Sequence, residues 1–317
     1  MLPSNAGIAP SPGPPPDFTA KLESWPALKL ADWKDTCATL HMWTQIVGKV
    51  RLALCPLINH WWEVPLYVSA RGLTTSPIPY SAGIFEVEFN FQEHILTIQT
   101  SGGAMQTVKL KPQSVADFYH EFMAALPALG IALKIWPVPV EIPNPIPFEK
   151  DFEHASYSPD QANTFWRILV AVDTVFKEFR SRFLGKDSPV HFFWGSFDLC
   201  VTRFSGRRAP DREGADPITR EAYSHEVISA GFWPGSGEIA EAAFYVYAAP
   251  EPAGFAQSPV RPSSAFYHPQ MHEFFLMYED VRRSSSPRDT LLEFLQSTYE
   301  AGANLAKWDR AALERAT

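Results

Sequence analysis

The side chains best suited to chemistry gather in one segment, Ser188–Arg208, with the sequence SPVHFFWGSFDLCVTRFSGRR. Arg203 and Arg207 flank a Ser-Gly pair near its end. Guanidinium groups bind carboxylates and phosphates through paired hydrogen bonds, and the glycine lets a ligand approach the backbone. The pattern therefore predicts an anion site at a strand-to-loop junction. An ordinary ion-pair cluster is the competing interpretation, because three acidic residues follow within positions 211–216.

A face that mixes aromatic and polar side chains is the second feature of this segment. If residues 191–202 form one strand, Trp194 and Asp198 point to the same side of the sheet. Such a face is either the floor of a pocket or a surface that helices cover, with its polar groups paired internally. We treat Trp194 as a candidate substrate-binding residue and Asp198 as a candidate catalytic carboxyl.

An earlier segment, residues 59–72, has a similar pattern in the sequence NHWWEVPLYVSARG. Aligning His60 with His191 gives a second strand that divides in the same way, and a long helical pattern precedes each copy. This similarity predicts a degenerate internal repeat. The polar face of the earlier copy supplies three more candidate substrate-binding residues: Trp61, Tyr67 and Arg71.

The histidines raise the question of a metal site. His60 and His191 occupy matching positions, where they either converge on one metal or are two copies of one structural contact. His268 and His272 have the spacing of a ligand pair on a helix that begins at Pro269, but no third ligand lies nearby in sequence. We expect no bound structural metal, and a histidine-based metalloenzyme is the weakest alternative.

His225 is the candidate catalytic partner of Asp198, because histidine titrates near neutral pH. His225 and Glu226 begin a string similar to HExxH, but Ser229 stands where the second histidine is required. The dinucleotide-binding motif GxGxxG, the phosphate-binding motif GxxxxGK[ST] and the nucleophile motif GxSxG do not occur. The reaction and any cofactor therefore stay unknown.

The composition narrows the class of protein. The 317 residues carry a formal net charge of −8, which disfavours nucleic acids and anionic membrane surfaces as partners. No apolar run reaches the roughly 18 residues of a membrane span, and the N-terminus lacks the basic start and apolar core of a secretory signal. Three scattered cysteines are typical of a reduced, cytoplasmic chain. The oligomeric state is unknown.

Helical and strand patterns alternate along the chain in two similar halves. Apolar spacings of three and four residues predict helices near 33–54, 114–130 and 158–185, with a last helix from Ser286. Alternation predicts strands at 85–91, 95–100, 105–110, 224–233 and 243–248. Short turns between strands favour an α+β fold, with antiparallel sheets and helices banked on one side, built from a degenerate duplicated helix-strands-helix unit.

Proline-rich segments mark the domain organisation. Residues 1–18 form a tail that we expect to be disordered. Residues 136–149 contain five prolines and form an extended linker. We expect residues 19–317 to be a single globular unit made of two pseudo-repeats, about 25–135 and 158–308.

Several long strings give the chain a family resemblance: HWWEVPLYV with RGLTTSPIPY, SPVHFFWGSFDL, TRFSGR and EAYSHEVISAGFWPG. With them, the chain resembles a bacterial family known as domain of unknown function 5996, from about Trp25 to Arg310. The resemblance implies a cytoplasmic bacterial protein and one conserved unit. It implies no activity, cofactor or catalytic residue.

Two functions stay open. The first is small-molecule binding or catalysis, with an anionic ligand as one option, in a pocket at the junction of the two repeats. The second is a non-catalytic interaction module that docks through exposed aromatics and proline-rich segments. A concave site lined from both halves favours the first, and a flat or convex aromatic patch favours the second.

Overall fold

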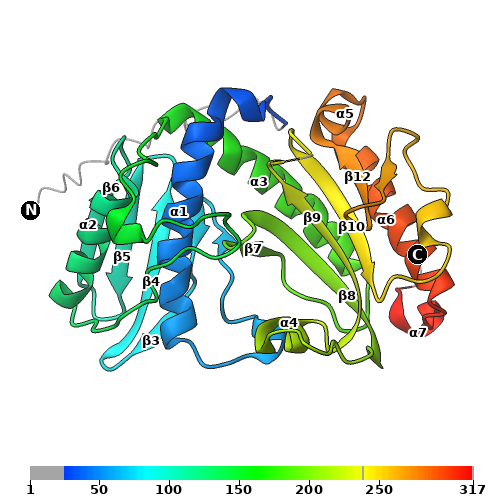
Figure 1. Cartoon of the computed structure of the whole chain (residues 1–317), viewed down its shortest axis with the longest axis horizontal. Coiled ribbons are helices and arrows are strands. Elements are labelled where there is room, and N and C mark those ends of the chain that lie inside the picture. The colour runs from blue at the N-terminus through cyan, green and yellow to red at the C-terminus, as the bar shows by residue number, and fades with distance from the viewer. Residues whose placement is uncertain (1–24, 238, 316–317) are drawn as a thin grey trace, which may run out of the picture.

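The computed structural model describes residues 25–237 and 239–315 (Figure 1). Within these residues, seven α-helices and two six-stranded antiparallel sheets form the α+β architecture that the patterning predicts. The tail expected at residues 1–18 lies outside the described residues. No helix in the described ranges is long and apolar enough to cross a membrane.

The first half of the chain builds one sheet, in the order β1-β2-β4-β5-β6, with β3 paired to β4 outside this path. Its strands are β1 (Tyr67–Val68), β2 (Gly72–Thr74), β3 (Ile78–Tyr80), β4 (Gly83–Asn90), β5 (Ile95–Thr100) and β6 (Met105–Lys109). The hairpin expected from residues 85–100 is confirmed, since Phe85 pairs with Thr100. Alternate residues of β4 are buried, so Glu86 and Glu88 face away from the core.

Helices α1 (Leu30–Leu54) and α2 (Val115–Ala128) pack together beside this sheet. Trp43 of α1 stacks on Phe118 of α2, with ring centroids 4.6 Å apart. Ser114 begins α2 as predicted, because its hydroxyl accepts a hydrogen bond from the Asp117 N–H at 3.0 Å.

The second half builds the other sheet, in the order β11-β12-β10-β9-β8-β7. Its strands are β7 (His191–Phe193), β8 (Asp198–Arg208), β9 (His225–Trp233), β10 (Ala243–Ala249), β11 (Phe266–His268) and β12 (Glu273–Met277). Helices α3 (Pro159–Ser181) and α6 (Pro287–Leu305) bank against one face (Figure 1). The short helices are α4 (Pro217–Ala222), α5 (Tyr278–Arg283) and α7 (Arg310–Leu313).

In the described residues, the two sheets meet edge to edge at one pair of residues. Leu66, just before β1, exchanges two backbone hydrogen bonds with Phe192 of β7, at 2.9 and 2.8 Å. Both side chains are fully buried, and one continuous apolar core contains residues of both halves. This contact fixes the first half of the chain against the second sheet.

The strand expected at residues 60–71 does not form. Residues 59–61 form a 3-10 turn (η1, Asn59–Trp61), in which His60 and Trp61 have φ angles of 62° and 60°. Positive φ reverses the chain and is incompatible with an extended strand, so only Tyr67–Val68 pair as β1. The alignment of His60 with His191 therefore has no structural counterpart, and the structure does not establish the duplication.

The continuous strand expected at residues 191–202 is instead a hairpin. Strand β7 ends before Trp194, and residues 194–197 turn the chain back, with a φ of 59° at Phe197. His191 pairs with Cys200. Because cross-strand partners share a face, these two side chains point to the same side, where a single strand would have placed them on opposite sides.

We propose that the two halves unfold as one cooperative unit, because they share a core and the Leu66–Phe192 pair. The full chain is expected to show one calorimetric transition. Fragments 1–145 and 150–317 are expected to be insoluble or molten when expressed separately, since each exposes the core surface of the other. Two soluble halves that melt independently would contradict this.

Candidate functional site

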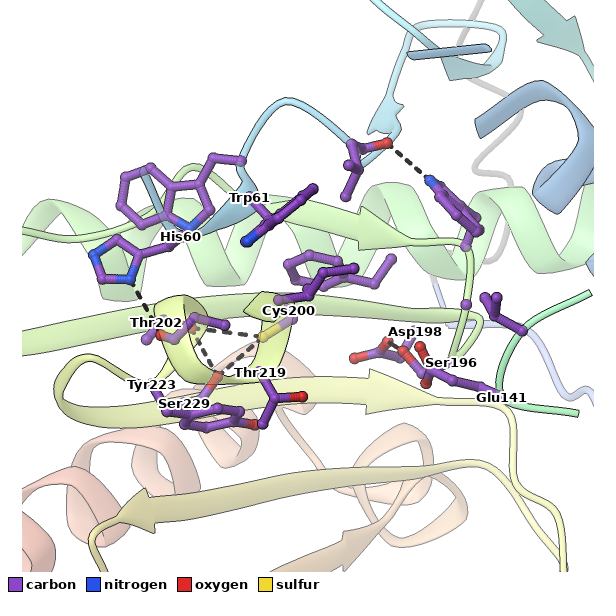
Figure 2. A pocket seen from close by; sticks show the side chains of 18 of the residues that line it. His60, Trp61, Glu141, Ser196, Asp198, Cys200, Thr202, Thr219, Tyr223 and Ser229 are labelled. Carbon is purple, nitrogen blue, oxygen red and sulfur yellow. Dashed lines mark hydrogen bonds between the residues drawn. The ribbon is translucent and has the colours of Figure 1, made fainter. Parts of the chain in front are cut away.

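A cavity of about 630 Å³ lies on the face of the second sheet that α3 and α6 leave uncovered. Its walls come from α1, residues 60–64, the linker, strands β7 to β10, and α4 with its flanking residues (Figure 2). Both halves of the chain therefore contribute to one concave site, and its size is typical of a pocket for small molecules.

The Asp198 carboxyl forms part of the pocket floor. It lies at the start of β8, is 5% exposed, and accepts hydrogen bonds from the hydroxyls of Ser196 and Tyr245. Burial raises the pKa of Asp198, and these hydrogen bonds oppose the rise. Gly231 makes room for the Tyr245 ring, because a Cβ there would lie 2.1 Å from the ring carbon Cζ.

Glu141, from the linker, lies beside this floor (Figure 2). The linker is tied to α1, because the side-chain amide of Gln45 exchanges two hydrogen bonds of 2.9 Å with the backbone of Val140. A Cβ at Gly195 would lie 2.3 Å from Glu141 Oε1, so the lack of a side chain at Gly195 leaves room for this carboxylate. Burial and the charge of Asp198 raise the pKa of Glu141.

Lys49 contributes an amine from α1. Its side chain is 3% exposed, and the ammonium lies 5.7 Å from the centroid of the Trp194 ring. Among the described residues it has no ion pair and no hydrogen bond. Burial lowers the pKa of Lys49 to about 8.

Trp194 owes its position to two neighbours. Its Nε1–H donates to the carbonyl of Val64 at 2.8 Å. Gly48 of α1 lets the indole pack against the helix, because a Cβ there would lie 2.2 Å from the ring. The hairpin turn that carries Trp194 is therefore held against Val64 and α1, which both belong to the first half of the chain.

A network of small polar groups lines the pocket between β8 and β9. The Thr202 and Ser229 hydroxyls are 2.8 Å apart, and Cys200 Sγ lies 3.0 Å from Ser229 Oγ (Figure 2). Burial raises the pKa of Cys200 to about 12, so the thiol stays protonated and is not a thiolate nucleophile.

His60 closes the far end of the pocket. Its Nδ1 lies 3.1 Å from the carbonyl oxygen of Ala222, and its Nε2 lies 2.7 Å from Lys186 Nζ. Nδ1–H therefore donates to the carbonyl while Nε2 accepts from the ammonium. Burial and the charge of Lys186 lower the pKa of His60. The ring is fully engaged in tying α4 to residues 59–61.

The structure brings only some of the sequence-predicted site residues together. Asp198, Trp61 and Trp194 line the pocket. The other five lie outside it. Arg71 and Arg207 form ion pairs with Glu88 and Glu226, and the Tyr67 ring contacts the Arg51 guanidinium. His225 lies beside the His60 ring, and Arg203 lies on the opposite face of the sheet.

Arg203 is a buried cation under the helices. Strand β8 continues past it, so the expected strand end does not exist. Its guanidinium lies 3.5 Å from the ring centroid of Phe179 and 4.3 Å from that of Tyr299, and it donates to the Phe179 carbonyl. Aromatic faces and a carbonyl contact this guanidinium in place of the acidic side chains of the ion-pair cluster considered above. The anion site predicted at Arg203 and Arg207 therefore does not assemble.

The other histidine pair lies on a hairpin. His268 ends β11 and His272 precedes β12, so the helical spacing expected from Pro269 does not apply. No group of three or more His, Cys, Asp or Glu side chains in the described ranges has a metal-binding arrangement.

Sequence reasoning missed Lys49 and Glu141. The signal for Lys49 was available, because it is the single charged residue in the string TLHMWTQIVGKV of α1. Glu141 stands in an extended proline-rich segment, where a carboxylate is ordinarily solvated. No local pattern marks it.

Comparison with known proteins identifies a family. A family model described as "Family of unknown function (DUF5996)" matches residues 25–315, which confirms the resemblance. No curated protein and no solved structure matches the chain.

Arg203→Ala is expected to lower the free energy of unfolding by about 3 kcal/mol, because it leaves a cavity under α3 and α6 and removes the aromatic contacts of the guanidinium. Urea unfolding measures the change. Arg208→Ala, an exposed position on the same strand, is the matched control and should change little. Equal stability of the two variants would show that Arg203 is not structural.

Proposed function

Since the chain belongs to the DUF5996 family, whose function is unknown, we propose a function from its pocket alone. The protein binds a small molecule in the cavity between its two halves and exchanges a proton with it through Asp198. Acid–base catalysis on a small substrate is the activity that this arrangement favours.

The observation that carries the proposal is the buried carboxyl itself. Asp198 has no cationic partner among the described residues, and its two hydrogen bonds come from neutral hydroxyls. A buried carboxyl without a cation opposes folding, so its presence on a pocket floor is better explained by function than by stability.

The neighbouring Glu141 adds the second group that acid–base chemistry needs. Desolvation, together with the negative charge of Asp198, raises the pKa of Glu141, and desolvation also raises the pKa of Asp198. The two carboxyls therefore hold a proton at a higher pH than isolated ones. One protonated and one ionised carboxyl in a single pocket can act as acid and base.

The pocket walls indicate what the ligand is like. Trp61 and Trp194 offer aromatic surface for an apolar body. The Trp61 Nε1–H is buried without a hydrogen-bond partner in the described residues, and a protonated Asp198 is also a donor. These donors favour a ligand that combines an apolar ring or chain with an acceptor such as a carbonyl oxygen. Neither Arg203 nor Arg207 is part of this proposal.

A docking role is the second candidate, because Trp136 and Phe152 are 71% and 66% exposed. These aromatics lie outside the pocket. Variants at Trp136 therefore separate the two functions.

Acetylnaphthalene, an apolar aromatic ketone, is expected to bind and to change the tryptophan fluorescence. Trp61→Ala should weaken its binding about tenfold, because it removes one stacking surface and the free donor. Trp136→Ala is the control and should bind as the unmodified protein does. Binding that is equal in all three proteins, or absent from all, would contradict the proposal.

Asp198→Asn is expected to raise the melting temperature at pH 7. The folded-state pKa of Asp198 lies above its unfolded value, so ionisation favours the unfolded chain above the unfolded pKa. The gain should shrink as the pH falls to about 4, near the unfolded pKa, and vanish below it, where the carboxyl is protonated in both states. Calorimetry between pH 4 and 8 measures it.

Asp216→Asn provides the matched control for this pH dependence. Hydrogen bonds from Thr219 and Ile218 lower the pKa of Asp216, which is the opposite direction. Its replacement should give no gain at any pH. A fall in stability of Asp198→Asn at pH 7 would show that the ionised carboxylate is a structural acceptor.

A further inference from the structure

We propose that Lys49 is a nucleophile that forms an imine with an aldehyde or ketone bound in the pocket. The inference rests on the proposed function, because it requires that the cavity bind a small molecule, and it names the substrate class as carbonyl compounds. Imine formation would add a covalent step to the proton transfer proposed for the same cavity.

The position of Lys49 is the first observation. A lysine on a surface helix normally extends into water, yet this side chain is 3% exposed and lines the cavity. No carboxylate pairs with it in the described residues. The amine is therefore enclosed without neutralisation, an arrangement that opposes folding and that a purely structural role does not explain.

The environment of the amine is the second observation. The ammonium lies 5.7 Å from the centroid of the Trp194 ring, which is held in place by Gly48 and by the hydrogen bond to Val64. Burial lowers the pKa of Lys49 to about 8, so about a tenth of the amine is uncharged at pH 7, against roughly one in 2,500 for an ordinary lysine. An uncharged amine is the form that attacks carbonyl carbon.

Acid–base groups share the cavity with the amine. Besides Lys49, the titratable side chains that line it from the surrounding elements are His60, Glu141, Asp198, Cys200, Asp216, Tyr223, Tyr245 and Tyr247. The pKa values of Asp198 and Glu141 are raised, so each carboxyl keeps its proton to a higher pH than an isolated one.

The reaction balances without any further reagent. The Lys49 Nζ lone pair forms the C–N bond, and the carbonyl π electrons move to oxygen, which takes the proton of a protonated Asp198. The nitrogen then gives one proton to a carboxylate. The C–O bond breaks as the hydroxyl takes a second proton from a carboxyl group and leaves as water, while the nitrogen lone pair forms the C=N bond. The nitrogen finally returns its remaining proton to that carboxylate. The products are an imine and one water molecule, with no change in overall oxidation state.

Reductive trapping on the full chain tests this inference. The protein is incubated with naphthaldehyde and cyanoborohydride at pH 7, and the modified peptides are identified by mass spectrometry. Lys49 is expected to be labelled at least tenfold faster than Lys34, an exposed lysine on the same helix. The rate should rise with pH through about 8, as the ammonium loses its proton.

Two variants complete the experiment. Lys49→Arg keeps a cation in the cavity and should abolish the fast labelling, whereas Lys34→Met should leave it unchanged. Calorimetry on each variant checks that it is folded. Asp198→Asn should slow labelling of Lys49 at saturating naphthaldehyde, because it removes the group that protonates the carbonyl oxygen.

The outcomes separate this inference from the proposed function. If acetylnaphthalene binds and naphthaldehyde labels Lys49 no faster than Lys34, the imine is wrong and the pocket proposal stands. If acetylnaphthalene does not bind and labelling shows no preference, both are wrong. Fast labelling that persists in Lys49→Arg would assign the reaction to another lysine and overturn the inference.

Discussion

The pair of backbone hydrogen bonds between Leu66 and Phe192 is the contact on which the pocket depends. It joins the edge of the first sheet to the edge of the second, so residues 60–64 and α1 must lie over the uncovered face of β8, β9 and β10. The glycines at positions 48 and 195 let the Trp194 indole and the Glu141 carboxylate come close. The cavity is therefore a product of how the halves meet, since neither half encloses it alone.

Burying a charged side chain opposes folding, and three such side chains in this protein have different explanations. Arg203 is enclosed by aromatic rings and one carbonyl within the core, although its Nε–H has no hydrogen-bond partner in the described residues. Asp198 has hydroxyl partners but no cation, and Lys49 has one aromatic face and no carboxylate. Asp198 and Lys49 line the cavity, whereas Arg203 lies on the opposite face of the sheet, under the helices. The two groups that face the cavity are those that a ligand can reach.

Local patterns predicted the regular elements well because short-range physics controls them. Apolar spacing located α1, α2 and α3, Ser114 marked the start of α2, and alternation located the β4–β5 hairpin. The two incorrect strand predictions, at residues 60–71 and 191–202, share one cause. Apolar and aromatic residues in alternation fit an extended strand, but they fit a chain reversal equally well when positive φ at His60 or Phe197 is held by tertiary contacts. The turn at residues 194–197 changed which side chains share a face, and so it changed the candidate site.

The sequence by itself determined the fold class and the family, because these follow from periodicity and long matching strings. It also singled out Asp198, Trp61 and Trp194, which line one cavity, but it did so through a repeat and a continuous strand that the structure does not contain. Only the tertiary structure decided which charges belong to that site. Arg203 and Lys49 are both cations next to apolar neighbours in sequence, and no local rule separates a cation that faces the helices from one that faces a cavity. The difference arises from contacts between residues at least 95 positions apart, such as those of Val64 with Trp194 and of Gln45 with Val140. These contacts bring together surfaces that local propensity does not relate.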